Sequence, residues 1–443
     1  MVTAPYDRRM RARAGIVVTG TEVLTGRVAD ANGSWLAEEL RRLGVDVGQV
    51  VVVGDRAADL LAALRFLAAS HDLVITTGGL GPTADDLTAA VVADFQARPL
   101  APDVALQTRI QRIVERLYAD RGWDSPAAEV RAGTAKQALV PRGARVLEPT
   151  GTAPGLVVPA PDGHDGPPVL VLPGPPRELR AMWPAALAAP EVAAALAGAV
   201  TLHEETIRIW GPPEAELAGL LRDHEARHGL DDLEVSTCLR DGELEVVTRF
   251  APEAAAAYRS LTAALVDRFG ARVFSTDGRT VDRVLADLLV ARGATVATAE
   301  SCTAGLVAGR LADLPGSSRY LLGGFVTYAN EAKTAEVGVP EQLLRQVGAV
   351  SEEVAVAMAA GARERLGTTY GLSTTGVAGP DGGTPEKPVG LVHVAVVSQD
   401  GVRHRALRLG GGRDAIRARS VTSLLHLLRE VVSAGPPGAH SVR

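Results

Sequence analysis

A serine and a lysine in the last third of the chain have the residue types of a nucleophile and its base. Ser301 comes just after an apolar run, 295–299, and Lys333 follows a second apolar stretch that ends at Tyr328. A serine hydroxyl is a weak nucleophile until a base takes its proton, and a serine–lysine pair is a known alternative to the Ser-His-Asp triad. The two residue types therefore predict nucleophilic catalysis.

The residues between 294 and 328 predict a βαβ unit that brings this pair together. A buried strand is expected at 294–298, a small-residue helix at 303–314 and a second strand at 324–328. In a right-handed crossover the two strands are parallel, and their carboxyl ends lie at the sheet edge where ligands bind. A third segment, 370–375, runs into the glycine-rich loop 376–383, whose amides can face a ligand. We expect these loops to converge on one pocket.

Each member of the pair also has a simpler interpretation. A serine at the start of a helix is a common N-cap, and most lysines are solvated surface charges. Catalysis requires burial or a cationic neighbour, such as Arg413, to lower the pKa of Lys333 from about 10.4. Tyr328 could relay the proton to the leaving group, or it could simply pack at the end of its strand.

Cys302 competes with Ser301 as the nucleophile, because a thiolate is the stronger attacking group. No histidine is placed beside it by the sequence, and neighbouring residues that enter a helix point about 100° apart, so only one of the two can face the pocket. We predict that Ser301 does. The backbone amides near Cys302 to Ala304 are the expected donors to the oxyanion of the reaction.

The composition is that of an ordinary soluble globular protein. The chain has 443 residues, of which 47% are hydrophobic and 22% charged, enough for two or three domains. A net charge of −6 disfavours nucleic acid as a partner. Cys238 and Cys302 are the only cysteines, so no disulfide framework or metal-type spacing exists, which fits a reducing cytoplasm. No segment approaches the length of a membrane span.

The organisation along the chain predicts an α/β fold class: two doubly wound three-layer α/β/α domains joined by a small α+β domain. Strand and helix patterns alternate from residue 15 to about 100, and Pro- and Gly-rich loops place a domain edge near 173. The predicted divisions are a first domain, a middle domain, a last domain and a disordered tail, at 1–172, 173–276, 277–434 and 435–443.

The strand ends of the first domain predict a second site. The glycine-rich loop 77–83 leads into a helix N-terminus, a position that favours phosphate. Carboxylates of Glu22, Asp55, Asp85 and Asp86 would repel a phosphate unless a cation intervened, and therefore imply a divalent metal ion. The alternative is helix capping by Thr83 and Asp86, but the glycine cluster favours ligand binding.

Motifs in the outer domains resemble those of the CinA family. The first domain resembles its molybdopterin-binding-like, or MogA-like, domain through Gly20-Thr-Glu22, Asn32, Asp55, Thr77-Gly-Gly-Leu-Gly-Pro-Thr83, Asp85-Asp86, Gly151-Thr-Ala-Pro-Gly155 and Leu172-Pro-Gly174. The last domain resembles the CinA C-terminal domain through Ala299-Glu-Ser-Cys-Thr303, Phe325-Val-Thr-Tyr328, Asn330-Glu-Ala-Lys333, Gly348-Ala-Val-Ser351 and Gly379-Pro-Asp-Gly-Gly383. Two positions depart from the family pattern: Ala304, where many relatives have glycine, and Glu148, where asparagine is more usual.

The resemblance implies that the last domain is a nicotinamide mononucleotide amidohydrolase that needs no cofactor. Such an enzyme releases ammonia and gives nicotinic acid mononucleotide for NAD recycling. For some members the resemblance also implies an ADP-ribose pyrophosphatase in the first domain, with a divalent cation such as magnesium and stimulation by potassium. A KH-like middle domain and a homodimer are implied as well. The alternatives for the first domain are a molybdopterin-binding module of cofactor synthesis and a ligand-sensing scaffold without chemistry.

The expected site residues follow from these motifs. At the C-terminal site, Ser301 is the nucleophile, Lys333 the base and Tyr328 the relay. The expected substrate contacts there are Cys302, Thr303, Gly305, Thr375, Gly376, Gly379 and Arg413, with the 376–383 loop or Arg413 meeting the substrate's phosphate. At the N-terminal site, the expected ligand contacts are Gly20, Glu22, Asn32, Thr77, Gly78, Gly79, Gly81 and Thr83, and the expected metal ligands are Asp55, Asp85 and Asp86.

Overall fold

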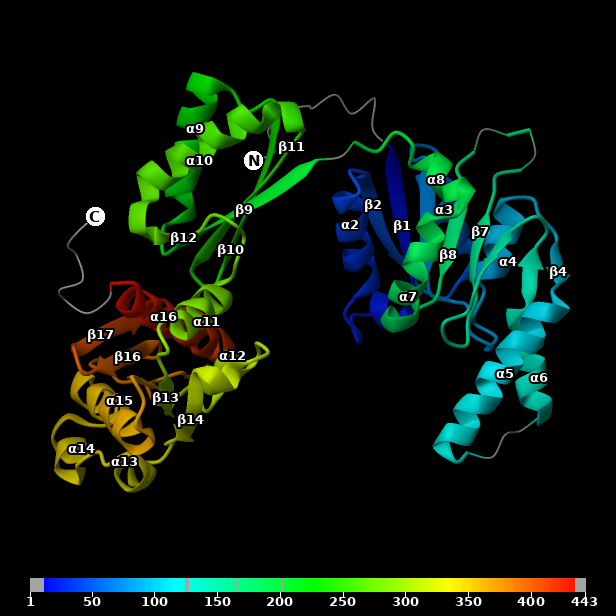
Figure 1. Cartoon of the computed structure of the whole chain (residues 1–443). Helices are drawn as coiled ribbons and strands as arrows, with labels where there is room; N and C mark the ends of the chain where they lie inside the picture. The colour runs from blue at the N-terminus through cyan, green and yellow to red at the C-terminus, as the bar shows by residue number, and fades with distance from the viewer. Residues whose placement is uncertain (1–11, 124–126, 162, 165, 201, 435–443) are drawn as a thin grey trace. The chain divides into compact units, whose positions relative to one another are not determined.

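The chain divides into two compact units in the computed structural model shown in Figure 1, which describes residues 12–123, 127–161, 163–164, 166–200 and 202–434. One unit ends at His203 and the other begins at Glu204. The predicted tail 435–443 lies outside the described residues. Within the described ranges, no helix combines the length and the apolarity that crossing a bilayer would need.

The first unit is built on a six-stranded sheet in the order β2-β1-β3-β8-β7-β6. The first four of these strands are parallel, and β7 and β6 run antiparallel to their neighbours. The strands are β1 (Arg13–Thr19), β2 (Asp46–Val53), β3 (Leu73–Thr77), β6 (Arg145–Leu147), β7 (Gly155–Val158) and β8 (Val169–Leu172).

Helices cover both faces of this sheet, because successive side chains of a strand point to opposite sides. On β1, Ile16 and Val18 enter one hydrophobic cluster and Val17 enters the other. The first cluster is closed by α2 (Asn32–Arg42), α7 (Pro176–Leu187) and α8 (Pro190–Ala195), and the second by α3 (Ala57–Ala68), α4 (Thr88–Phe95) and α5 (Val104–Arg121). The short helix α1 (Thr21–Leu24), the helix α6 (Ala127–Gln137) and the antiparallel pair β4 (Leu100–Pro102) and β5 (Leu139–Pro141) complete the unit.

The first unit extends past the predicted domain edge near residue 173. Met182 and Trp183 of α7 and Val192 of α8 are buried in the same cluster as Ile16 of β1. The proline-rich loop that suggested an edge is therefore a connection inside the unit, and the predicted boundary is too early. An amphipathic pattern shows that a helix has a buried face, but not which sheet buries it.

The second unit begins with the predicted small α+β domain. Its sheet has the order β10-β11-β9-β12. Its elements are β9 (His203–Trp210), α9 (Glu214–His228), β10 (Leu233–Arg240), β11 (Glu243–Phe250), α10 (Ala255–Phe269) and β12 (Val273–Ser275). The predicted hairpin is confirmed: Arg240 pairs with Glu243, and Asp241 and Gly242 between them have φ values of 51° and 87°. Positive φ at both central residues is the conformation that a tight hairpin turn requires.

The last domain has a five-stranded mixed sheet in the order β14-β13-β15-β16-β17. The predicted parallel pairing of β13 with β14 is confirmed; β15 is also parallel to β13, and β16 and β17 are antiparallel. One face packs on α11 (Val281–Ala291), α12 (Leu306–Ala312) and α16 (Arg413–Ala434), and the other on α13 (Asn330–Val337), α14 (Glu341–Val347) and α15 (Glu352–Leu366). The strands are β13 (Val296–Glu300), β14 (Leu321–Val326), β15 (Tyr370–Gly376), β16 (Leu391–Ser398) and β17 (Gly401–Arg408). The predicted α/β class is thus the observed one.

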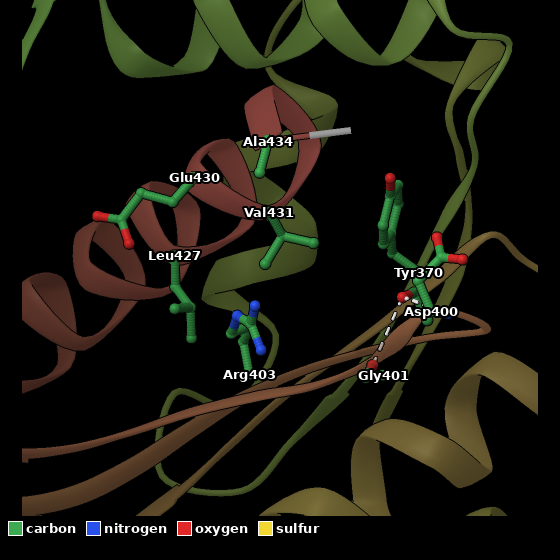
Figure 2. A pocket seen from close by; sticks show the side chains of 9 residues that line it. Tyr370, Asp400, Gly401, Arg403, Leu427, Glu430, Val431 and Ala434 are labelled. Carbon is green, nitrogen blue, oxygen red and sulfur yellow. Dashed lines mark hydrogen bonds between the residues drawn. The ribbon is translucent and has the colours of Figure 1, made fainter. Parts of the chain in front are cut away.

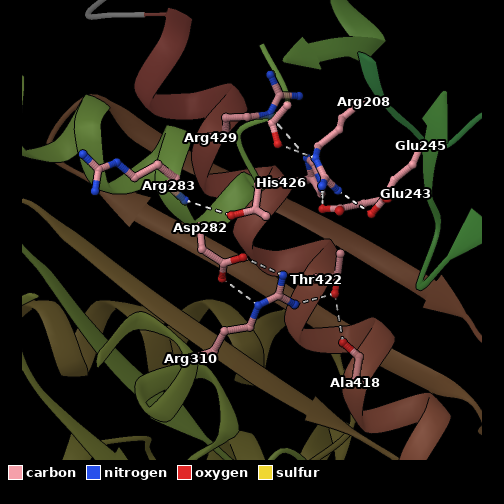
Figure 3. A network of polar contacts seen from close by, with 12 residues as sticks. Arg208, Glu243, Glu245, Asp282, Arg283, Arg310, Ala418, Thr422, His426 and Arg429 are labelled. Atoms are coloured by element: carbon pink, nitrogen blue, oxygen red, sulfur yellow. Dashed lines mark hydrogen bonds and ion pairs between the residues drawn. The ribbon is translucent and has the colours of Figure 1, made fainter. Parts of the chain in front are cut away.

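Helix α16 also contacts the small α+β domain, and Figure 3 shows the polar network between them. His426 lies 2.7 Å from the carboxylate of Glu243 on β11. Arg310 of α12 forms an ion pair with Asp282 of α11 and donates to the hydroxyl of Thr422 on α16 at 2.7 Å. The same helix that carries these contacts presents Arg413 and Arg417 at its N-terminal end.

Two elements near the predicted nucleophile differ from expectation. The strand continues to Glu300, and the helix begins at Leu306 rather than near Thr303. Ala304 and Gly305 have φ values of 51° and 93°, so the residues after Ser301 form a turn that cannot be helical. Lys333 lies within α13 and not at a strand end.

Candidate active site

Ser301 and Lys333 meet at the carboxyl edge of the parallel strands. Ser301 follows the last residue of β13, and its amide still donates to the Thr374 carbonyl of β15 at 2.9 Å. Lys333 reaches the same edge from α13, where its Nζ lies 3.1 Å from Ser301 Oγ. The predicted pair is therefore within hydrogen-bonding distance.

Lys333 Nζ is surrounded by oxygen atoms in a buried position. Its Nζ donates to the carbonyl oxygens of Thr327 at 2.9 Å and Tyr328 at 3.1 Å, and these atoms can only accept. If both hydrogens of a neutral amine are used there, the lone pair is left for the Ser301 hydroxyl. Lys333 is 1% exposed, and this burial lowers its pKa, whereas the nearby Cys302 and Glu331 act in the opposite direction. Arg413, the cation suggested from the sequence, is not a cause of this shift.

Cys302 has the wrong environment for a nucleophile. It is 5% exposed, and burial raises the pKa of its thiol to about 11. A thiol with that pKa is almost entirely protonated near neutral pH, whereas a reactive cysteine needs a depressed value. The geometry therefore favours Ser301 over Cys302.

Glu300, the last residue of β13, holds the turn that carries Ser301. Its buried carboxylate accepts hydrogen bonds from the Thr303 hydroxyl at 2.7 Å and from the amides of Gly305, Val307 and Ala308 at 2.9, 3.0 and 2.8 Å. These are orphan donors at the start of α12, which a serine N-cap was expected to satisfy. The sequence analysis missed this role, because the acceptor precedes the helix by several residues and lies outside the usual N-cap position.

Several expected substrate contacts are instead structural. Thr303 is fully buried and bonded to Glu300, and the Gly305 amide is taken by the same carboxylate. Thr375 is 1% exposed and donates to the Ala349 carbonyl at 2.7 Å. A Cβ on Gly376 would lie 2.6 Å from the Leu391 carbonyl oxygen, so close strand pairing explains that glycine. The predictions that these residues bind substrate directly are therefore not supported by their geometry.

Tyr328 and Arg413 lie at the exposed rim of the site. Arg413, the first residue of α16, donates to the Gly379 carbonyl at 2.8 Å and to the Tyr328 hydroxyl at 3.0 Å. Tyr328 is 56% exposed, so its hydroxyl is not confined to a packing role. The guanidinium is exposed as well and can meet an anionic group of a ligand without desolvation.

A separate cavity of about 260 Å³ lies at the other edge of the same sheet. Figure 2 shows Arg403 and Tyr370 in it, with Leu427 and Val431 of α16 opposite. Tyr370 pairs with Val296 at the start of β13, whereas Ser301 follows its end. This cavity therefore does not include the serine and the lysine.

The first unit contains a cavity of about 480 Å³ at the carboxyl ends of its parallel strands. Nine predicted site residues line it: Gly20, Glu22, Asn32, Asp55, Thr77, Gly78, Gly79, Asp85 and Asp86. Gly81 lines a smaller neighbouring cavity instead, and Thr83 is bonded to the acidic pair. The lining also includes Asp30, whose carboxylate accepts from the Asn32 and Gly33 amides at 2.9 Å.

Asn32 is held at the cavity wall with an unused acceptor. Its Nδ2 donates to the Thr77 hydroxyl at 2.9 Å and to the Gly174 carbonyl at 2.6 Å, while its buried Oδ1 has no hydrogen-bond partner among the described residues. Thr77 in turn donates to the Pro173 carbonyl at 3.0 Å. A buried acceptor without a partner costs free energy, and a ligand donor in the cavity would relieve that cost.

The expected metal ligands share the cavity but are partly engaged. Asp55 accepts from the amide and the hydroxyl of Thr21, both at 2.8 Å. The Thr83 hydroxyl lies 2.6 Å from Asp86 and also bonds Asp85, whose pKa it lowers. Among the described residues, no three His, Cys, Asp or Glu side chains come together to hold an ion. The donor set fits a cation bound jointly by one or two carboxylates and a ligand's phosphates, as magnesium commonly is.

Two family models match the outer parts of the chain. A family model described as "CinA C-terminal domain" matches residues 279–432, and one described as "Probable molybdopterin binding domain" matches residues 15–194. A crystal structure of the competence/damage inducible protein CihA from Agrobacterium tumefaciens is 43% identical, covers 34% of this chain and 93% of that chain, and has a TM-score of 0.33.

Two relatives match over almost the full length. The CinA-like protein of Mycobacterium tuberculosis is 52% identical over 433 residues, which are 97% of this chain and 99% of that protein. The CinA-like protein of Mycolicibacterium gilvum is 53% identical over 429 residues, 96% of this chain and 100% of that protein. Because the identity is this high along nearly the whole chain, the protein belongs to the CinA family.

Proposed function

We propose that the last domain is a serine amidohydrolase that converts nicotinamide mononucleotide to nicotinic acid mononucleotide and ammonia. The observation that carries this proposal is the 3.1 Å contact between Ser301 Oγ and the buried amine of Lys333, whose pKa is lowered. The substrate itself is taken from the resemblance to the CinA C-terminal domain. The exposed Arg413 supplies a cation for the phosphate of that substrate.

The proposed reaction uses Lys333 first as a base and then as an acid. Ser301 Oγ attacks the amide carbon, and its proton passes to Lys333 Nζ. When the tetrahedral intermediate collapses, the carbon–nitrogen bond breaks and the ammonium of Lys333 returns the proton to the leaving ammonia. Water then attacks the acyl-serine ester with Lys333 again as the base. The carbon–Oγ bond breaks, Lys333 returns the proton to Ser301 Oγ, and the acid leaves as its carboxylate. Tyr328, next to Arg413 at the rim, is in reach to share the proton transfer to the leaving group.

The test is ammonia release from nicotinamide mononucleotide by the whole protein. We expect turnover that falls by at least about 10³-fold in Ser301→Ala and persists in Cys302→Ala. Both substitutions are small and occupy neighbouring positions of one turn, so each is a control for the other. Turnover that survives in Ser301→Ala and disappears in Cys302→Ala would reverse the assignment of the nucleophile.

For the first unit we propose a metal-dependent ADP-ribose pyrophosphatase, and the acidic cavity of about 480 Å³ favours it. A divalent cation bound there would neutralise the charge of a pyrophosphate. The free Oδ1 of Asn32 would accept from a ligand hydroxyl, and the Gly78–Gly79 turn brings backbone close to the ligand. Potassium stimulation and a homodimer stay predictions from the family resemblance.

The first unit can be tested separately. ADP-ribose cleavage should require added magnesium or manganese and be lost in Asp85→Asn and Asp86→Asn, but be retained in the matched control Asp94→Asn on the exposed side of α4. Manganese binding can be followed by electron paramagnetic resonance in the same variants. Molybdopterin binding without cleavage would support the cofactor-synthesis alternative, and an absence of any metal effect would support a scaffold.

A further inference from the structure

Arg417 holds the turn after Ser301 through two of its carbonyl oxygens. Its Nε donates to the Cys302 carbonyl at 3.1 Å, and its Nη2 donates to the Thr303 carbonyl at 2.9 Å. A planar guanidinium that donates to two consecutive carbonyls fixes the orientation of both peptide groups. Arg417 is partly buried on α16, one turn after Arg413.

The turn depends on such external contacts. Ala304 and Gly305 are both left-handed, with φ values of 51° and 93°, and Ala304 is a residue that rarely adopts this conformation. Inside the turn, the Ala304 amide donates to the Ser301 carbonyl at 3.1 Å. Glu300 accepts hydrogen bonds from groups at the far end of the turn, whereas Arg417 donates hydrogen bonds to the carbonyls of the two residues after Ser301. The position of the serine hydroxyl relative to Lys333 therefore depends on both charged side chains.

Arg417 forms no direct ion pair within the described residues, and its two hydrogen bonds to the turn go to neutral carbonyls. Its charge acts to lower the pKa of the neighbouring Cys302 thiol, whereas the Glu300 carboxylate of the same turn acts to raise it and burial outweighs both. The Thr303 amide has no backbone acceptor in the described part of the chain, and Arg417 polarises this N–H because it donates to the Cys302 carbonyl of the same peptide group. A preorganised positive charge of this kind stabilises an oxyanion without reorganisation.

We propose that Arg417 is a positioning residue of the amidase: its guanidinium fixes the turn that presents Ser301 to Lys333 and provides the positive field behind the oxyanion. This inference rests on the proposed serine amidohydrolase function. Arg417 acts through the peptide groups of Cys302 and Thr303 and does not itself touch the substrate. Arg413, by contrast, lies at the rim, where the phosphate is expected.

Steady-state kinetics of the full chain test this role. In Arg417→Gln we expect kcat for nicotinamide mononucleotide to fall about 10- to 100-fold with KM within about threefold, because only the transition state carries the oxyanion. Arg417→Lys keeps the charge but not the fork and should retain an intermediate kcat. In Arg417→Ala, added methylguanidinium should restore part of the lost rate. Arg419→Gln, on the exposed side of the same helix, is the matched control and should behave as the wild type.

A second measurement separates this inference from the proposed substrate. A fluorophosphonate probe phosphonylates an activated serine with fluoride as the leaving group and develops charge on its phosphoryl oxygen. Its labelling rate at Ser301 therefore reports on the turn without nicotinamide mononucleotide. Slower labelling in Arg417→Gln than in the wild type and Arg419→Gln supports the role, even if the wild type does not hydrolyse the nucleotide. Unchanged labelling and kcat in folded Arg417→Gln overturn it. If Arg417→Gln does not fold, the Arg417→Lys variant is used in its place. Wild-type kcat and wild-type labelling in Arg417→Lys, together with no rescue of Arg417→Ala by methylguanidinium, would also overturn the proposal.

Discussion

His426 Nε2 lies 2.7 Å from Glu243 Oε1, and this contact joins α16 to the sheet of the small α+β domain. His426 is fully buried, with its ring stacked on Trp210 at 4.0 Å between centroids and edge-on to Phe274 at 4.7 Å. Burial lowers the pKa of His426, and Glu243 offsets part of that effect. The neutral imidazole is therefore the form that the fold favours.

This relationship predicts a pH-dependent stability of the second unit. The pKa of His426 is lower in the folded state than the value of about 6.5 expected in the unfolded chain, so protons bind preferentially to the unfolded chain. The stabilising contribution is present above about pH 6.5 and is lost as the pH falls through the folded-state pKa. Urea unfolding at pH 7 and pH 5 should show this loss, and His426→Gln should reduce it. An equal pH dependence in that variant would contradict the assignment.

Lys333 predicts the pH dependence of the amidase. Because burial lowers its pKa, kcat/KM should rise with pH as the amine loses its proton and level off below the ordinary lysine range near about 10.4. Lys333→Met should lower kcat by about 10²- to 10⁴-fold and leave a flat profile. The stability of the wild type relative to this variant should rise as the pH approaches the unfolded lysine value, because a depressed pKa costs stability only at lower pH.

Replacement of Arg413 is expected to weaken binding only of substrates that carry a phosphate. Arg413→Gln should raise KM for nicotinamide mononucleotide by about 10-fold or more, since a charge-assisted hydrogen bond is lost. Any hydrolysis of nicotinamide riboside, which lacks the phosphate, should change little. Initial rates with both substrates measure the difference. Equal losses with the two substrates would place Arg413 elsewhere in the reaction.

Replacement of Ala304 by glycine is expected to stabilise the folded protein. Its φ of 51° is unfavourable for a residue with a Cβ, so Ala304→Gly should raise the unfolding free energy by about 0.5–1 kcal/mol. The matched control is Ala357→Gly inside α15, which should lower it by about 0.5–1 kcal/mol. Urea denaturation compares the two. A loss of stability in Ala304→Gly would mean that the methyl group packs more favourably than its backbone strain costs.

Replacement of Glu300 by the nearly isosteric glutamine is expected to destabilise the folded protein. In Glu300→Gln, one carboxylate oxygen becomes an NH₂ group that faces backbone N–H donors of α12. We expect the unfolding free energy to fall by about 1–3 kcal/mol, as for other buried donors left without an acceptor. The control Glu336→Gln lies on the exposed side of α13 and should change it little. Similar values for the two variants would contradict the proposed role of Glu300.

Around Ser301, the sequence predicts the strands but not the contacts that distant residues make. The alternation of apolar residues predicts β13 and its parallel neighbours, because strand periodicity is a local property. The start of α12 was placed too early, since Ala304 is left-handed and Glu300 caps the helix from a strand. The site role of Arg417 was also missed, because in sequence it is one of several arginines on a helix.

The sequence indicates Ser301 and Lys333 as the proposed nucleophile and base by residue type, and its strand pattern places Ser301 at the carboxyl edge of the sheet. The sequence does not show which way burial shifts the pKa values of Lys333 and Cys302, or that Arg417 donates to the turn after Ser301. Those properties depend on burial, and burial results from packing α13 and α16 against strands far away in the chain. Charge in a buried site follows the surrounding dielectric and partners, which exist only once distant segments are in contact.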